Sequence, residues 1–178
     1  YFTDWDVPAY SSQFNTLTNI TIRNCSFINF TEGGWGANAE GGTNIFFYDN
    51  YVDFSSSSFD SGGLYLYVVN TGVIDGNDIF VSTGEGMTNY AIDILSSKSI
   101  NISHNDARGG NTTILLNGFN NSFVFENNIS GGKKNGIALG GYFSANNRIF
   151  NNKIWDINGT GIYDGRGIYT NNCNNTYV

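Results

Sequence analysis

The chain has 178 residues, a formal net charge of −7 and 13% charged residues, and it contains 28 Asn, 23 Gly and a single Pro. The acidic balance and the lack of an Arg- or Lys-rich run exclude nucleic acid and anionic membranes as partners, and no apolar run reaches the roughly 18 residues of a membrane-inserted helix. Because Asn and Gly tolerate left-handed conformations, the composition indicates one domain of short strands and tight corners.

The first 16 residues carry five aromatic side chains without following any repeat: Tyr1, Phe2, Trp5, Tyr10 and Phe14. We therefore expect residues 1–16 to form an irregular aromatic N-terminal arm that lies over the first turn of the fold or along one of its faces. The sequence opens without Met or a signal peptide, which indicates a processed or excerpted chain.

From residue 17 onwards, one short pattern returns six times: an apolar residue, two further residues, Asn, one residue and a second apolar residue. The repeated polar position is occupied by Cys25, Asn50, Asn77, Asn105, Asn127 and Asn152. The steps between these positions are 25, 27, 28, 22 and 25 residues. Such a period is typical of architectures that build one supersecondary unit per repeat.

A second apolar series runs between these copies and consists of Leu64, Ile92, Ile114, Ile137 and Ile162. Each repeat therefore carries at least two short strands. No repeat contains the ten or so residues of helical period that a crossover helix needs. The pattern predicts an all-β parallel solenoid over residues 17–178, with about six to seven rungs by its count of copies.

Stacked rungs lie about 4.8 Å apart, so equivalent side chains form columns along the axis. We expect the Asn positions to point inward as an asparagine ladder, each bonding to the Asn above and below and to corner backbone. Between the first two copies, the stretch 33–36, Gly-Gly-Trp-Gly, is predicted to be a turn or loop. Residues 54–64 and 81–87 are predicted to be polar loops.

Two of the repeats read Asn19-Ile-Thr-Ile-Arg-Asn-Cys-Ser-Phe and Ser99-Ile-Asn-Ile-Ser-His-Asn-Asp-Ala. In these the chain resembles the pectin-lyase-like family of right-handed parallel β-helices, including the NosD-like repeats of surface proteins. The resemblance implies a single-stranded right-handed parallel β-helix. It implies little about function, because this fold hosts lyases, hydrolases, epimerases, adhesins and purely structural coils.

Polar residues flank the ladder on neighbouring rungs, and the candidate catalytic set is Asp78, His104, Asp106 and Glu126. Asp78 and Asp106 are expected to stack about 5 Å apart, a separation that suits a retaining glycosidase or a shared cation. His104 beside Glu126 would then be an oriented general acid or base. The alternative is that these are corner residues facing water. The motifs of polygalacturonase-like and pectate-lyase-like sites are absent, which favours the alternative.

Other chemistry is excluded by spacing. Asp93 and Asp164 fall on one strand series three rungs apart, roughly 14 Å, too far for either glycosidase geometry. One His and two Cys give no metal-ligand pattern, and no cofactor is predicted. Cys25 and Cys173 are six rungs apart, about 29 Å, so they cannot form a disulfide.

Five aromatic residues are predicted to face outward on the strands that precede the ladder: Phe46, Tyr48, Phe123, Phe125 and Phe150. We expect a contiguous aromatic patch there, and such a patch marks a contact surface. The occupant is the N-terminal arm, a carbohydrate or a neighbouring subunit.

Nine Asn-x-Ser/Thr sequons point to an extracellular or cell-surface glycoprotein: Asn19, Asn24, Asn29, Asn101, Asn111, Asn120, Asn128, Asn158 and Asn174. The expected function is a structural surface β-helix that self-assembles into a filament or envelope layer, or forms part of a longer surface protein. Its expected partners are itself or other envelope proteins. The alternatives are a polysaccharide hydrolase or lyase, and a non-catalytic carbohydrate-binding module.

The last repeat stops inside a rung at Tyr177-Val178, which leaves an open strand edge. Three explanations fit: a longer parent chain, completion of the end by the next subunit in a filament, or a cap that the pattern does not reveal.

Overall fold

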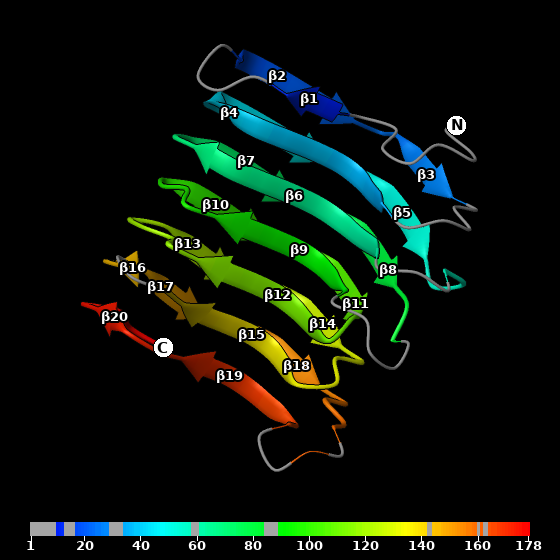
Figure 1. The fold of residues 1–178 in the computed structure, drawn as a ribbon, viewed down its shortest axis with the longest axis vertical. Coiled ribbons are helices and arrows are strands. Elements are labelled where there is room, and N and C mark those ends of the chain that lie inside the picture. The colour runs from blue at the N-terminus through cyan, green and yellow to red at the C-terminus, as the bar shows by residue number, and fades with distance from the viewer. Residues whose placement is uncertain are drawn as a thin grey trace.

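The computed structural model describes residues 10–12, 17–28, 34–57, 61–83, 89–141, 144–159, 161 and 164–178. Every regular element in these residues is a β-strand, and every named strand pair is parallel. The strands stack into a parallel β-solenoid (Figure 1). The predicted fold class is therefore confirmed. The described part of the chain has no helix that could cross a membrane.

Three sheets form the sides of the coil, and they are called A, B and C here. Sheet A contains β3 (Ser26–Ile28), β5 (Tyr51–Phe54), β8 (Asp78–Val81), β11 (Asp106–Gly109), β14 (Asn128–Ser130) and β18 (Lys153–Trp155). Sheet B contains β1 (Tyr10–Ser12), the first part of β4 (Gly34–Tyr48), β6 (Ser61–Val69), β9 (Tyr90–Leu95), β12 (Thr112–Asn117), β15 (Asn135–Gly140) and β19 (Arg166–Thr170).

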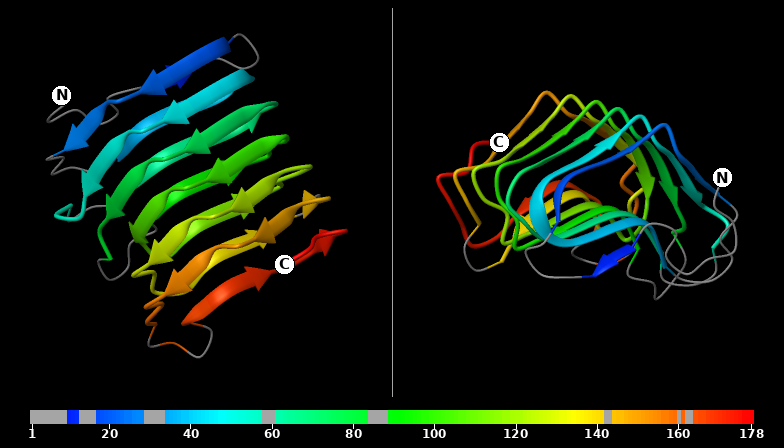
Figure 2. Two further views of the ribbon diagram at one scale, coloured as in Figure 1. Left: turned by 180° about the vertical axis from the view of Figure 1, so that it is seen from behind. Right: turned by 90° about the horizontal axis from the view of Figure 1, so that it is seen from above.

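Sheet C contains β2 (Thr18–Arg23), the second part of β4, β7 (Gly72–Asp75), β10 (Ile100–Ser103), β13 (Phe123–Phe125) and β17 (Arg148–Phe150). A two-stranded sheet pairs β16 (Ser144–Ala145) with β20 (Cys173–Asn174). The six strands of sheet A define five full turns between β3 and β18, and β19 and β20 belong to a further turn. Seen from above, successive turns lie behind one another around a common interior (Figure 2).

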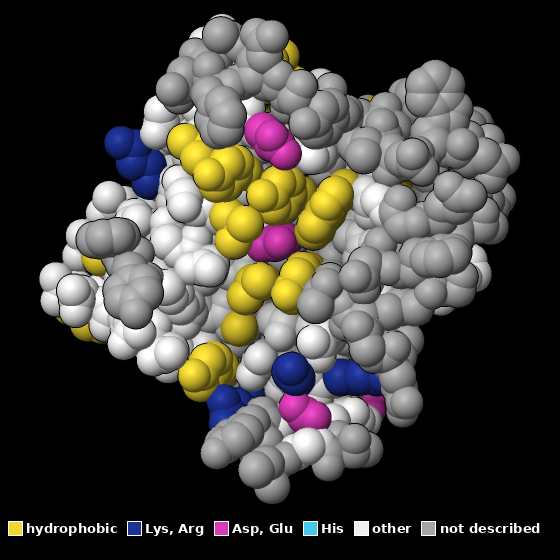
Figure 3. Space-filling view, viewed as in Figure 1, with side chains coloured by type: hydrophobic (Ala, Val, Ile, Leu, Met, Phe, Trp, Pro, Cys, Tyr) yellow, Lys and Arg dark blue, Asp and Glu magenta, His cyan; other side chains and the backbone are white. Residues whose placement is uncertain are grey.

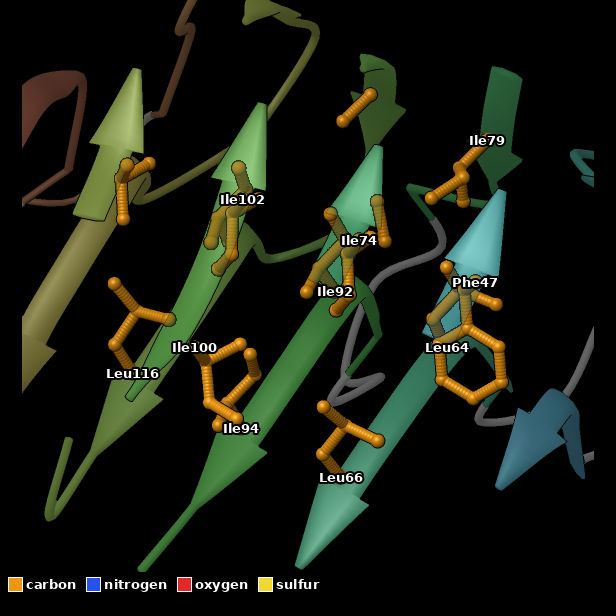
Figure 4. Packing of buried hydrophobic residues seen from close by; sticks show 14 of the residues in the cluster. Phe47, Leu64, Leu66, Ile74, Ile79, Ile92, Ile94, Ile100, Ile102 and Leu116 are labelled. Atoms are coloured by element: carbon orange, nitrogen blue, oxygen red, sulfur yellow. The ribbon is translucent and has the colours of Figure 1, made fainter. Parts of the chain in front are cut away.

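The interior is filled by apolar columns because parallel register places equivalent residues of successive rungs side by side. Ile102 pairs with Ile74 on one neighbouring strand and with Val124 on the other, and all three are fully buried. Figure 4 shows Ile74, Ile92 and Ile102 converging from different strands on one core.

The asparagine ladder is confirmed in detail. The Oδ1 atom of Asn127 accepts hydrogen bonds from the backbone N–H and the Nδ2 of Asn105, at 3.0 and 2.9 Å. Asn105 does the same for Asn77, and Asn77 for Asn50. Cys25 begins the series, and its backbone N–H donates to Asn50 at 3.1 Å. In every copy the residue before the ladder position has a φ of 52–66°, which turns the chain from sheet C into sheet A.

A second inward polar series, which the sequence analysis did not predict, lies at the corner before sheet C. The Oδ1 atom of Asn147 accepts the N–H of Ser122 at 3.2 Å, and the Oγ of Ser122 accepts the N–H of Ile100 at 3.0 Å. Ser122 and Asn147 are fully buried. The rungs of Ile100, Ser122 and Asn147 are thus linked at a second corner, where side chains replace strand hydrogen bonds that are interrupted.

Two sequence predictions about local structure were wrong. Gly34 to Gly36 belong to the long strand β4 and not to a turn. Gly36 is needed there because a Cβ would lie 2.8 Å from the carbonyl oxygen of Gly63 on the next rung. The second apolar series continues from Ile137 to Ile168 and not to Ile162, because the connection after β18 is longer than the period predicts.

Several predicted features fall partly or wholly outside the described residues. Of the N-terminal arm, only Tyr10–Ser12 is described. This segment forms β1 and pairs with β4, so it adds a strand to sheet B where an irregular arm was expected. Residues 58–60 and 84–87 of the predicted loops lie outside the described residues, as does Asn29. The first loop was predicted too long, because Phe54 ends β5 and residues 61–64 already belong to β6. Val81, at the start of the second predicted loop, ends β8.

Candidate functional site

The two aspartates of the predicted catalytic set lie side by side on the outer side of sheet A. Asp106 pairs in register with Asp78, as the columns predicted. The Asp106 carboxylate, however, is engaged by its neighbours: Arg108 Nε donates to Oδ1 at 2.9 Å and Asn128 Nδ2 donates to the same atom at 3.2 Å. The Arg108 guanidinium in turn lies 5.1 Å from the centroid of the Phe80 ring. This is a surface ion pair resting on an aromatic ring.

His104 belongs to a different cluster. Its Nδ1 lies 2.7 Å from Asp75 Oδ1, and its Nε2 lies 2.9 Å from Glu126 Oε2. The pKa of His104 is raised above its ordinary value. The hydrogen bond to Asp75 is the largest cause, and the hydrogen bond to Glu126 acts in the same direction. An imidazole that donates through both nitrogens is an imidazolium and has no free lone pair. Both ring nitrogens of His104 are engaged in this arrangement, so the imidazole bridges neighbouring rungs.

The structure thus divides the predicted catalytic set. Asp78 and Asp106 lie on sheet A with Arg108, whereas His104 lies at the corner between Glu126 and Asp75 and contacts both carboxylates. Asp75 was not predicted to be part of this cluster. Its position two residues before Asn77 could have indicated it, because the register places Asp75 beside Ser103, next to His104. Among the described residues, no group of three or more His, Cys, Asp or Glu side chains is placed to hold a metal ion.

The predicted aromatic patch lies on sheet C, but it is not contiguous. Between Tyr48 and Phe125 the same column carries Asp75 and Ser103. What remains are two separate stacks, one of Phe46 on Tyr48 at 5.9 Å and one of Phe125 on Phe150 at 5.2 Å. Phe123, 39% exposed, lies on the same strand as Phe125, two residues before it. The prediction was wrong on continuity because the strands β7 and β10 interrupt both columns with smaller side chains.

The sequons differ in how accessible they are. Asn19, Asn24, Asn101, Asn158 and Asn174 are exposed, as attachment of a glycan requires. The amides of two half-buried ones are occupied, because Asn120 Nδ2 donates to the Gly118 carbonyl and Asn128 Nδ2 donates to Asp106. Asn111 is half-buried as well.

The most distinctive surface of the described residues is the outer side of sheet B, called the sheet-B face here. Three aromatic residues form a row on it, called the ring row. Trp35 stacks on Tyr65 with 4.9 Å between ring centroids, and Tyr65 stacks on Tyr67 at 6.5 Å. Trp35 lies over Gly62, where a Cβ would overlap the indole. Figure 3 shows hydrophobic side chains running down this face with acidic groups set among them.

Asp93 lies within this face on the rung after the ring row. It pairs in register with Tyr65 of β6 on one side and with Leu115 of β12 on the other. Although its side chain is on the outer side of the sheet, Asp93 is only 5% exposed, and its Oδ1 has no hydrogen-bond partner. Burial raises the pKa of Asp93 to about 7. The pKa of Tyr65 is raised to about 12, mainly by burial and secondly by the charge of Asp93.

Beyond Asp93 the sheet-B face is hollowed. Ala138 and Gly140 lie between the larger side chains of Leu115 and Tyr169, and this leaves a depression of about 210 Å³. The guanidinium of Arg166 lies 4.6 Å from the Tyr169 ring at the far side. The face therefore offers flat rings, one isolated carboxylate and a shallow groove, in that order along the axis.

The sequence analysis missed this face. Tyr65 and Tyr67 alternate with the fully buried Leu64 and Leu66, so the second apolar series already implied that both rings face outward. Asp93 was considered only as a partner for Asp164, which lies outside its column: Asp93 is followed by Leu115, Ala138 and Tyr169.

In chemical terms the sheet-B face is suited to binding. Stacked rings accept a flat apolar surface, and an unpaired carboxylate accepts hydrogen bonds or a positive charge. Comparisons of this chain with family models, with curated proteins and with solved structures find no match.

Proposed function

We propose that this chain is a non-catalytic, glycan-binding β-solenoid of a secreted or cell-surface protein, and that the sheet-B face is its binding surface. The observation that carries the proposal is the ring row of Trp35, Tyr65 and Tyr67 on the outer side of a parallel sheet. Solvent-facing positions of a sheet are ordinarily polar, and a group of aromatic rings there marks a contact surface.

The rings are held in place before any ligand arrives. Tyr65 and Tyr67 stand on the strand β6, and Trp35 is fixed between Tyr65 and the backbone at Gly62. A preorganised platform loses little side-chain freedom on binding, so more of the contact energy appears as affinity. Flat rings suit the apolar face of a sugar ring better than they suit a flexible side chain.

Other features support the same reading. The side chains predicted to be catalytic are engaged in structural contacts, His104 by two carboxylates and Asp106 by Arg108. Five exposed sequons and the resemblance to pectin-lyase-like surface repeats support an extracellular location.

The test is binding of neutral, acidic and amino polysaccharides, measured by affinity electrophoresis and calorimetry. Tyr65→Ala should weaken binding about two- to tenfold, since a ring stack contributes about 0.5–1.5 kcal/mol. Phe125→Ala, which removes a stacked ring from sheet C, is the matched control and should bind as the unmodified protein does. Lack of binding to the whole panel, or equal losses in both variants, would overturn the proposal.

An enzyme assay on the same panel addresses the catalytic alternative. Release of reducing ends or unsaturated products that His104→Ala and Asp106→Ala both abolish would show that the chain is a polysaccharide-acting enzyme. We expect no such release.

A second candidate function is lateral self-association through sheet C. The stack of Phe125 on Phe150, with Phe150 42% exposed and Phe123 39% exposed, favours it. Sedimentation of the unmodified protein should show a concentration-dependent dimer that Phe123→Ser with Phe150→Ser removes, whereas Tyr51→Ser, on sheet A, should leave it intact. A monomer at all concentrations would dismiss this candidate.

A further inference from the structure

We propose that the sheet-B face selects sugars that carry a protonated amine, with the Asp93 carboxylate receiving the ammonium group and the ring row supporting the sugar ring. This inference rests on the glycan-binding function proposed above and names the class of ligand for that site.

Asp93 lacks the partners that a buried carboxylate normally has. A carboxylate that is 95% removed from solvent ordinarily has a cation or several donors beside it, because burying it unpaired is costly. Asp93 Oδ1 has none, and the described residues form no ion pair with Asp93. The chain does pair other carboxylates, such as Asp106 with Arg108. Asp93 is thus a vacant acceptor set into a binding surface.

The charges around Asp93 determine the sign of the charge that the ligand carries. The described residues in register with Asp93 are Tyr65 of β6 and the uncharged Leu115 of β12, and Glu40 and Tyr67 surround Tyr65 together with Asp93. None of these is a cation. The charges of Asp93 and Glu40 both act to raise the pKa of Tyr65, so the local field is negative. A uronic acid would be repelled here, and a positively charged group would be attracted.

The number of available ligand oxygens distinguishes an organic ammonium from a metal ion. Calcium takes about six to eight oxygen ligands, whereas the described residues form no group of three or more His, Cys, Asp or Glu side chains here, and Asp93 offers one carboxylate whose Oδ1 has no partner. An ammonium group needs only one such acceptor, and it is also attracted to the faces of aromatic rings within about 6 Å. Carboxylate and stacked rings together therefore fit an amine carried on a flat ring.

The amine requirement has a pH signature. Burial holds the pKa of Asp93 near 7 in the empty site, and a bound ammonium lowers it by favouring the charged form. Binding is then coupled to loss of the Asp93 proton, so affinity should rise between about pH 5 and pH 7. It should fall again where the amine of the sugar loses its own proton.

The experiment compares three probes by calorimetry: a glucosamine oligomer, its fully N-acetylated counterpart and an oligolysine peptide. We expect the glucosamine oligomer to bind at least about tenfold more tightly than the acetylated one, because a charge-assisted bond is lost on acetylation. Asp93→Asn should abolish this difference, and Asp78→Asn, which alters an exposed carboxylate on sheet A, should preserve it. Tyr65→Ala should weaken both sugars.

The outcomes separate the two proposals. If both oligomers bind equally in a Tyr65-dependent manner, or if Asp93→Asn keeps the preference, the amine inference is overturned and glycan binding stands. If neither oligomer nor any other glycan binds, both are overturned. If oligolysine binds as tightly as the glucosamine oligomer and depends on Asp93, the site recognises amines on proteins, and the assignment to a sugar is wrong.

Discussion

Replacing Asn127 with leucine tests the role of the ladder most directly. The Asn127 side chain is 2% exposed. Its Nδ2 donates to the carbonyls of Ile102 and Phe125 and to Asn152 Oδ1, at 2.9–3.0 Å. Its Oδ1 accepts from the backbone N–H and the side chain of Asn105. One side chain therefore connects three successive rungs, and a leucine of similar volume keeps the space filled while removing all of these bonds.

The expected cost follows from what is left unpaired. The backbone N–H of Asn105 loses its acceptor in a buried position, and an unsatisfied buried group costs about 1–3 kcal/mol. The bonds donated by the amide are lost as well, each with a net value of about 1 kcal/mol, and burial of the leucine offsets part of this. We expect Asn127→Leu to lower the free energy of unfolding by about 2–4 kcal/mol.

Equilibrium urea unfolding measures this change, with the m-value checked because stacked repeats can unfold in parts. Asn101→Leu is the matched control: Asn101 is exposed on β10, one rung away, so the same substitution there should change stability by less than about 0.5 kcal/mol. Equal effects of the two substitutions would show that the ladder bonds do not stabilise the fold and would refute the reasoning.

Three more predictions follow from single side chains. His104 is the only histidine, so an NMR titration should give a single imidazole pKa, above about 6.5, and Glu126→Gln should lower it. Because the pKa of His104 is raised in the folded protein, its contacts with the two carboxylates stabilise the fold fully below about pH 6.5. This stabilisation is lost as the pH rises through the raised pKa. Asp93→Asn should stabilise the protein at pH 8 by up to a few kcal/mol but not at pH 4, because a raised carboxyl pKa lowers stability as pH increases; equal stabilisation at both pH values would contradict this. Gly62→Ala should displace the Trp35 ring and change its fluorescence.

The ladder was predictable because its period is imposed by geometry. Each turn must return to the same corner one strand spacing higher, so a residue that bonds to its own copy above and below recurs once per turn. Asn105 and Asn127 were predicted to be buried, and they are 1% and 2% exposed. The predicted free state of the two cysteines also holds, since Cys25 and Cys173 form no disulfide.

The predicted strand register was wrong where the length of the repeat varies. The predicted series assigned Ile162 to the column of Ile137, but the chain inserts further residues after β18 and supplies Ile168 instead. Similarity of sequence alone does not reveal how long a loop between strands is. The same uncertainty placed Asp164 in the column of Asp93 and led to a comparison of two residues that are not equivalent.

The candidate site was predicted only in part. The columns placed Glu126 beside His104, and these two side chains are hydrogen-bonded. The second partner of the imidazole, Asp75, lies in a neighbouring column and was not predicted. Asp93 is shielded from solvent by the size of the side chains around it, and none of them donates a hydrogen bond to its Oδ1. The spacing of residues along the chain does not encode this shielding.

The position of Asp93 within the solenoid explains how the fold tolerates it. In a stacked repeat, the stability of each rung comes from its interfaces with two neighbours. The strand of Asp93, β9, lies between β6 and β12, and its inward neighbour Ile92 is fully buried between Leu64 and Ile114. A central rung is released only when its interfaces with both neighbouring rungs are lost. It therefore tolerates a buried, unpaired carboxylate that would detach a rung held by a single neighbour. Asp93 provides no stabilising contact of its own on this rung, so the binding role proposed for the sheet-B face would account for a group that stability alone does not require.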